Sequence, residues 1–114
     1  MSENLFLVFS KPPASLPEGQ FHTWYEDHIR ENILTPGFRA ARRYAVETIP
    51  DRAEVSFPYN HLAIYEFAGE WGKLRASLDQ RIQAGEIVLP TWHDDVRFAN
   101  WNCTALGDRV EPAQ

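Results

Sequence analysis

The stretch from Phe21 to Ile33 has the spacing of an amphipathic helix with an aromatic face. Its inward positions recur at i, i+3, i+4 and i+7, as on one side of an α-helix; they are Phe21, Trp24, Tyr25, His28, Ile29, Asn32 and Ile33. Thr35, Pro36 and Gly37 end the helix, because proline disfavours helical backbone before it and glycine commonly follows a helix. The sequence therefore predicts that a histidine, His28, lies on the face of the helix that packs against the protein interior.

Runs of apolar or alternating residues predict four strands and a second helix around this first one. We expect strands over 5–10, 38–46, 61–67 and 98–106, and helices from about 18 to the stop at 35–37 and over 70–84. The order β-α-β-β-α-β is that of the split ferredoxin-like arrangement. The sequence thus predicts a single α+β domain over 1–114 (core about 5–106), with a four-stranded antiparallel sheet and both helices on one face.

The strand pattern also predicts a homodimer. Both faces of the first and third strands are largely apolar, although the two helices cover only one face of the sheet. A chain of 114 residues has nothing left to cover the second face except another copy of itself. We therefore expect two copies to pair sheet against sheet.

Charge and composition exclude several classes of partner. The net charge is −5 and no basic cluster exists beyond Arg39, Arg42 and Arg43, which argues against nucleic acid and against an anionic membrane surface. No apolar run approaches the ~18 residues of a membrane span, and the N-terminal residues lack the pattern of a signal peptide. With Cys103 the single cysteine, no internal disulfide or thiolate metal cage is expected, and the expected location is cytoplasmic.

Several motifs together resemble a known group of proteins. They are Trp24-Tyr25-Glu26-Asp27-His28-Ile29, Pro36-Gly37-Phe38, Ala41-Arg42-Arg43-Tyr44, Ser10-Lys11-Pro12 and Leu62-Ala63-Ile64-Tyr65-Glu66. With them the chain resembles the dimeric α+β barrel superfamily and, within it, the small EthD-like proteins, from about Leu5 to Leu106. The resemblance implies a homodimer whose paired sheets close a barrel, with a pocket between sheet and helices in each subunit.

The resemblance restricts the class of ligand more than it restricts the type of reaction. Members of the superfamily include muconolactone isomerases, cofactor-free monooxygenases, polyketide cyclases and small haem-degrading enzymes. Haem-degrading members carry a histidine on the second helix, and residues 70–86 contain none here, so haem is not expected. The loop around Trp92 and His93 has no counterpart in the general pattern, and its role as a lid or a dimer contact stays open.

His28 is the main candidate for a catalytic residue. An imidazole with a pKa near 6.5 can take or give a proton at working pH. Glu31, one turn further along, or Asp94 and Asp95 from the later loop are candidates to orient one ring nitrogen. The structural alternative is a buried histidine that hydrogen-bonds a backbone carbonyl.

Aromatic residues on the same helix and on two strands complete the candidate pocket. Trp24 and Tyr25 are candidates for its walls, or are core residues between helix and sheet. Alternation places Tyr44 with Phe38, Ala40, Arg42 and Val46, and suggests that Tyr44 and Tyr65 share a face, where two phenols would hold an enolate oxygen. Packing in the core is the alternative for both tyrosines.

Two further pairs are candidates for substrate binding. Arg42 and Arg43 are adjacent and point to opposite faces of a strand, so one of them lies inward and needs an anion, either a carboxylate such as Glu66 or one on the substrate. Trp92 and His93 lie on the long loop. Because adjacent residues such as His93, Asp94 and Asp95 rarely converge on one ion, no metal is expected.

These residues support a hypothesis about the reaction class. We interpret the chain as a small cofactor-independent enzyme that acts by proton transfer on an apolar aromatic, lactone or polyketide-like metabolite, as an isomerase, cyclase or lyase of a catabolic kind. His28 would be the general acid or base, with the tyrosines and an arginine stabilising an enolate or phenolate. The alternatives are a cofactor-free monooxygenase and a non-catalytic accessory protein that binds a small molecule.

Overall fold

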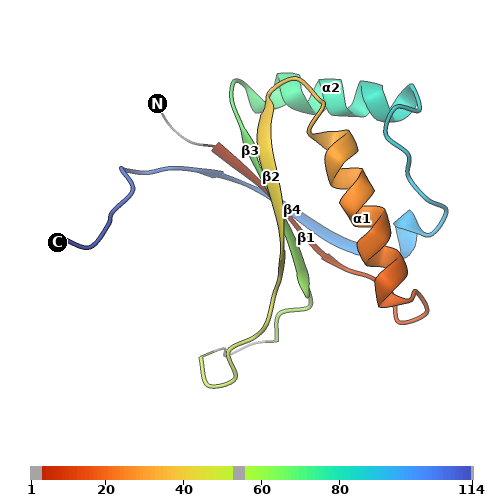
Figure 1. Ribbon diagram of the computed structural model, residues 1–114, viewed down its shortest axis with the longest axis horizontal. Helices are drawn as coiled ribbons and strands as arrows, with labels where there is room; N and C mark the ends of the chain where they lie inside the picture. The colour runs from red at the N-terminus through yellow and green to blue at the C-terminus, as the bar shows by residue number, and fades with distance from the viewer. Residues whose placement is uncertain (1–3, 53–55, 114) are drawn as a thin grey trace.

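The chain folds into one antiparallel sheet with two helices packed on one side (Figure 1). The computed structural model describes residues 4–52 and 56–113. The elements in order are β1 (Asn4–Lys11), α1 (Glu18–Asn32), β2 (Phe38–Ala45), β3 (His61–Phe67), α2 (Trp71–Gln83), a single 3₁₀ turn η1 (His93–Asp95) and β4 (Arg97–Thr104). The sheet order β2-β3-β1-β4 confirms the predicted ferredoxin-like α+β fold.

The core lies between the sheet and the two helices. On α1 the spacing of Phe21, Tyr25 and Ile29 buries all three against the sheet, and Phe21 is wholly inaccessible to solvent. Val8 of β1 and Ala63 of β3 lie opposite each other in the sheet and belong to the same cluster. The small side chain of Ala63 leaves room for these aromatic rings.

A second, smaller cluster lies beneath α2. Leu74 and Leu78, one turn apart on that helix, pack with Phe67 at the end of β3 and with Ile87 in the loop that follows the helix. The two clusters together hold both helices on the same face of the sheet, which leaves a space between α1, α2 and the strands.

The expected alternation in β2 is wrong at one end. Phe38 pairs with Phe67 and Ala40 with Glu66, so one extra residue, Arg39, interrupts the ladder between β2 and β3. Consecutive side chains of a strand point to opposite faces, so one extra residue changes the face on which the preceding side chain lies. The bulge therefore turns Phe38 toward the helices, where it packs on the ring of Tyr65 with centroids 4.9 Å apart. Ala40 and the residues after it keep the predicted alternation.

The face of the sheet away from the helices is largely apolar, as predicted, although Arg42 and Glu66 also lie on it. In the described part of the chain neither helix covers it (Figure 1). Strand pairing puts these side chains together on that face: Leu5, Leu7, Phe9, Leu62, Ile64, Tyr44 and Trp101. Trp101 is 62% exposed in the single chain. The rings of Phe57 and Tyr59, from the segment before β3, pack against Phe9.

One arginine connects the two helices where α1 ends. Arg81 of α2 donates from Nη1 to the backbone oxygen of Glu31 at 2.7 Å and to Oγ1 of Thr35 at 2.6 Å. The last carbonyls of a helix lack partners within the helix, so a cation supplied by α2 stabilises this end. Gly37 follows with φ of 110°, a conformation that glycine adopts without strain.

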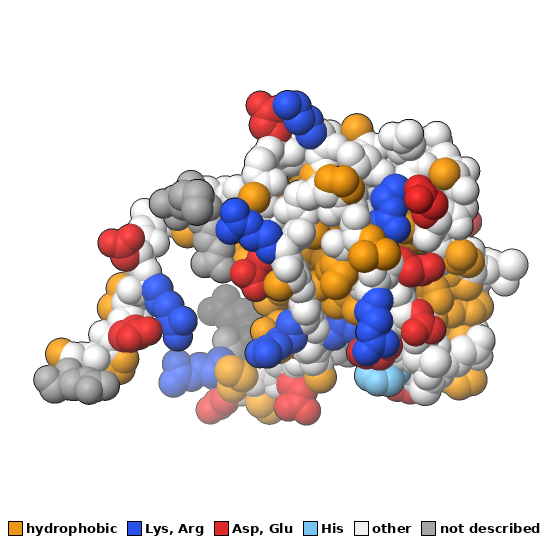
Figure 2. Space-filling view, turned by 45° about the horizontal axis from the view of Figure 1, so that its top comes forward, with side chains coloured by type: hydrophobic (Ala, Val, Ile, Leu, Met, Phe, Trp, Pro, Cys, Tyr) orange, Lys and Arg blue, Asp and Glu red, His pale blue; other side chains and the backbone are white. Residues whose placement is uncertain are grey.

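On the surface drawn in Figure 2, acidic and basic side chains are interspersed with apolar atoms, and this face shows no continuous basic patch. Among the helices of the described residues, none is long and apolar enough to cross a bilayer.

Candidate active site

A cavity of about 270 Å³ lies between the sheet and the two helices. Its walls are mainly apolar and come from β1, α2 and β4, including Phe6, Val8, Trp71, Leu78 and Phe98. Polar groups enter from three other elements: His28 and Asn32 from α1, Tyr65 from β3, and His93 from η1. A mainly apolar hollow with a few convergent polar groups is typical of a small-molecule site.

Three of these polar side chains form a connected chain. The side-chain nitrogen of Asn32 lies 3.0 Å from Nε2 of His28, one helical turn earlier, and donates to the hydroxyl of Tyr65 at 3.0 Å. Both N–H groups of one amide are therefore engaged, one toward α1 and one toward β3. Asn32 thus fixes His28 and Tyr65 relative to each other.

His28 is neutral at physiological pH. Burial, and secondly the electrostatic interaction with nearby His93, lower the pKa of His28 to about 4. The amide nitrogen of Asn32 can only donate, so Nε2 of neutral His28 accepts and Nδ1 carries the proton. Within the described residues the buried Nδ1 has no hydrogen-bond partner. His28 is thus a donor without an acceptor.

The tyrosine beside it is also a donor. Burial raises the pKa of Tyr65 to about 12, although the hydrogen bond from Asn32 and the charge of Arg43 act in the opposite direction. Because Tyr65 accepts from Asn32, its own O–H remains available. Burial and the neighbouring Tyr65 raise the pKa of Tyr25 well above its ordinary value, so Tyr25, which also lines the cavity, is protonated as well.

Aromatic rings from α1 and from the long loop pack beside His28. Trp24 stacks on the imidazole of His28 with centroids 4.4 Å apart, and Trp92 packs edge-on against Trp24 at 5.1 Å. Neither tryptophan is part of the cavity lining, whereas His93 is, with its ring 4.9 Å from that of Phe98. The loop that the sequence left without an assigned role therefore closes one end of the site.

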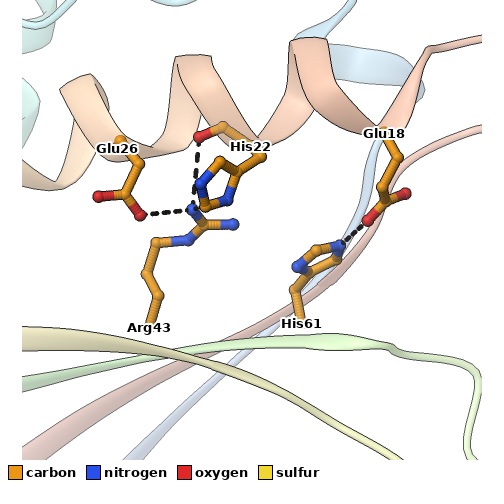
Figure 3. Close-up of polar contacts among 5 residues, drawn as sticks. All are labelled: Glu18, His22, Glu26, Arg43 and His61. Atoms are coloured by element: carbon orange, nitrogen blue, oxygen red, sulfur yellow. Dashed lines mark hydrogen bonds and ion pairs between the residues drawn. The ribbon is translucent and has the colours of Figure 1, made fainter.

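Arg43 is the inward arginine and points toward α1 (Figure 3), but it is not part of the cavity lining. Its Nη1 donates to Glu26 at 2.8 Å and contacts Nδ1 of His22 at 3.0 Å. The guanidinium also lies over the ring of Tyr25, 4.6 Å from its centroid. The predicted anion for an inward arginine exists, but it is Glu26 and not Glu66.

Two other candidates lie on the opposite face of the sheet. Tyr44 pairs with Leu62 and Arg42 with Ile64, whereas Tyr65 pairs with Ala41 on the helix side. The expectation that Tyr44 and Tyr65 share a face is therefore wrong. Alternation correctly predicts that Tyr44 and Arg42 share a face within β2, but it does not predict which face of β2 lies beside which face of β3.

The expected partners of His28 differ from the observed one. Glu31, Asp94 and Asp95 do not hydrogen-bond His28 among the described residues, and Asn32 takes this place. On the exposed side of α1, His22 and Glu26 both contact Arg43. His61 pairs with Glu18 at 2.6 Å, which joins the start of β3 to the start of α1 (Figure 3). No three His, Cys, Asp or Glu residues converge as metal ligands within the described ranges.

Sequence reasoning missed several residues of the cavity. Asn32 was expected on the inward face of α1 but was given no role; an amide among aromatic residues on that face was the available signal. Arg75 and Asp79 of α2 and Asn100 of β4 also line the cavity. Arg75 and Asp79 look like a surface ion pair in sequence, at i and i+4.

The fold matches known structures, although no family model and no curated protein matches the chain. A DABB family protein with a ferredoxin-like fold from Mesorhizobium loti superposes with a TM-score of 0.65 at 11% identity, over 94% of this chain and 100% of that one. An EthD family protein from Bacillus halodurans and a dimeric ferredoxin-like protein of unknown function from Thermobifida fusca are also among the similar structures.

The similar structures include two enzymes. The hydroxynitrile lyase from Passiflora edulis has a TM-score of 0.59 at 13% identity, over 96% of this chain and 97% of that one. SnoaB, a cofactor-independent oxygenase from Streptomyces nogalater, matches as its N63A mutant with a TM-score of 0.55 at 12% identity, over 98% of both chains. At these identities the likeness establishes the fold: the chain has the ferredoxin-like architecture that DABB and EthD family proteins share.

Proposed function

We propose that this protein is a small enzyme that moves a proton on an apolar, oxygen-bearing metabolite without a cofactor. The observation that carries the proposal is the chain His28–Asn32–Tyr65, which sets the protonated hydroxyl of Tyr65 beside the neutral imidazole of His28 at one apolar cavity. Donors fixed in advance stabilise negative charge that develops on a carbonyl or phenol oxygen. The electrostatic interaction between such a donor and the charged oxygen is stronger in a site from which water is largely excluded.

The proposed step is the formation of an enolate or phenolate. The hydroxyl of Tyr65, which Asn32 fixes beside the neutral imidazole of His28, donates to the substrate oxygen. A base removes a proton from the carbon next to a carbonyl, which gives an enolate, or removes the hydroxyl proton of a phenol, which gives a phenolate. His93 is the candidate base, because it brings a second imidazole to the same cavity from η1. The proton taken by His93 returns at another carbon in an isomerisation, or is lost with a leaving group in a lyase reaction.

The size of the cavity favours a small substrate. A volume of about 270 Å³ lies at the lower limit of the ~300–1,000 Å³ usual for small-molecule sites. One or two rings, such as an aromatic ketone, a phenol or a lactone, fit better than a large polyketide. Phe6 and Trp71, whose rings lie 4.6 Å apart, offer aromatic faces to such a ring.

We also propose that the working form is a homodimer. The apolar face of the sheet, with Leu7 and Ile64 opposite each other near its centre, is a surface that a second copy covers by symmetry. Light scattering should give twice the mass of the 13.2 kDa chain. Leu7→Arg should yield the single-chain mass, and a monomeric wild-type protein would contradict this part of the proposal.

Deuterium exchange tests the reaction without knowledge of the natural substrate. Small aromatic ketones, phenols and lactones are incubated with the protein in D₂O, and mass spectrometry detects carbon-bound deuterium. For a compound that exchanges, His28→Gln and Tyr65→Phe should each slow the exchange about 10²–10⁴-fold. His22→Gln is the matched control, because His22 lies on the same helix but contacts Arg43 outside the cavity.

Exchange that is equally fast in wild type and in His28→Gln would refute the proposed role of His28. Compounds that bind but never exchange would favour the accessory binding protein instead. The cofactor-free monooxygenase is a second candidate, supported by the likeness to SnoaB. Oxygen consumption with a bound phenol, measured with an oxygen electrode, distinguishes it from the isomerase or lyase.

A further inference from the structure

The cavity has a second polar end that the proposed proton transfer does not use. Arg75 of α2 and Asn100 of β4 line the cavity together with His28 and Tyr65. An adjoining hollow of about 160 Å³ shares Arg75 and Asn100 and adds Asn102. Polar side chains from two elements therefore meet where the cavity joins this second hollow.

Arg75 occupies an unusual position on its helix. It lies one turn from Trp71 and one turn from Leu78, and all three line the cavity. A cation thus stands at the edge of the apolar face of α2, with its side chain 59% exposed. Lys73, two residues earlier, is 85% exposed, is not part of the cavity lining and lies near Glu70.

These groups are exposed and make few hydrogen bonds to protein atoms. Arg75 donates from Nε to Asp79 at 3.2 Å, and this contact fixes one edge of the guanidinium. Its two terminal nitrogens and the side-chain amides of Asn100 and Asn102 bond no protein atom among the described residues, so they are open to solvent or to a ligand. The terminal nitrogens form the fork that binds a carboxylate through two parallel hydrogen bonds.

Sheet order gives the distance between the two polar ends. Tyr65 lies on β3 and Asn102 on β4, and Phe6 of β1 lies opposite both of them. One strand therefore separates the two sides of the cavity floor, a spacing of roughly 10 Å. The floor between them is apolar, with Val8 between Ala63 and Asn100 in the next row.

We propose that the substrate carries a carboxylate, which Arg75 and Asn100 bind about one aromatic ring system away from the oxygen that Tyr65 holds beside His28. This inference rests on the proposed function, because it assumes that the His28 end holds the reacting oxygen. The substrate class is then a one- or two-ring aromatic or alicyclic carboxylic acid with a carbonyl or phenol at the far end. Arg75 sets specificity and takes no part in the proton transfer.

Two probes of equal shape test the inference. 6-Hydroxy-2-naphthoate has a phenol and a carboxylate at opposite ends, and 6-hydroxy-2-naphthamide replaces the carboxylate with a neutral amide. Dissociation constants are measured at pH 7 and low salt from the quenching of tryptophan fluorescence, to which Trp71 in the cavity wall contributes. We expect the carboxylate to bind about tenfold more tightly than the amide.

Matched variants test whether Arg75 causes the preference for the carboxylate. Arg75→Gln should bring the two dissociation constants together, whereas Lys73→Gln, which removes the same charge from the same helix, should keep the preference. Asp79→Asn should increase the preference, because it removes a negative charge beside the guanidinium. Circular dichroism of each variant checks that the fold is retained.

The outcomes separate this inference from the proposed function. If wild type binds the amide as tightly as the carboxylate, or if Arg75→Gln keeps the preference, the carboxylate site is refuted while the proton-transfer site stands. If the preference depends on Arg75 but His28→Gln leaves deuterium exchange unchanged, the proposed function fails and the carboxylate site stands. Failure of both probes to bind would overturn the carboxylate site, whereas the proton-transfer site is decided by the deuterium exchange.

Discussion

Replacing His28 should flatten the dependence of folding stability on pH. In the folded chain burial and His93 lower the pKa of His28 to about 4, from 6.5 in the unfolded chain. The unfolded state therefore binds the proton more strongly, so this contribution to stability is present above pH 6.5 and is lost as the pH falls toward 4. Linkage gives a loss of about 2 kcal/mol between pH 7 and pH 5, and about 3 kcal/mol in full.

Urea unfolding at pH 7 and pH 5, at one fixed protein concentration, measures this loss. Wild type should lose about 2 kcal/mol more than His28→Gln over that range, whatever the two proteins' stabilities at pH 7. A proton NMR titration of the His28 ring should give a midpoint well below 6.5. His93→Gln should raise that midpoint only in part, because burial is the larger cause. Parallel stability curves, or a midpoint near 6.5, would refute the assignment of a buried neutral imidazole.

Three substitutions test how the helices are held. Arg81→Met should cost about 2–3 kcal/mol, because it removes charged hydrogen bonds to Thr35 and to the end of α1; urea unfolding that leaves stability unchanged would contradict this. Gly37→Ala should cost about 1–3 kcal/mol, since φ is 110° there and a Cβ would lie 3.0 Å from the side chain of a leucine on α2. Gly72→Ala, in open space within α2, should instead raise the thermal midpoint through about 0.5–1 kcal/mol of helix propensity; equal effects at the two glycines would refute the argument from local backbone.

The fold could be predicted from the sequence because its elements have clear local signals. The spacing of Phe21, Tyr25 and Ile29 predicts α1 and its buried face, and the alternation from 61 to 67 gives β3 with its observed bounds. The bulge at Arg39 carries no glycine or proline to mark it. It depends on how β2 pairs with β3, which is a contact between distant parts of the chain.

The site was only partly predictable for the same reason. His28 lies beside the cavity, as its position in the helix pattern suggested. Its link to Tyr65 through Asn32, however, joins residues far apart in sequence. Arg43 illustrates the same limit: alternation shows that one of two adjacent arginines lies inward, but the identity of its carboxylate depends on the packing of α1 over β2.

The single extra residue in β2 gives this strand one position at which its length can change without turning over either surface of the sheet. Phe38 and Ala40 already face opposite sides, because they pair with the adjacent residues Phe67 and Glu66 of β3. Deletion of Arg39 would therefore close the bulge, with Phe38 still in the core and the cation of Arg43 still over the ring of Tyr25. Deletion of one residue within β3, whose pairing with β1 has no extra residue, would instead exchange part of the surface that meets α1 for the surface offered to a second subunit.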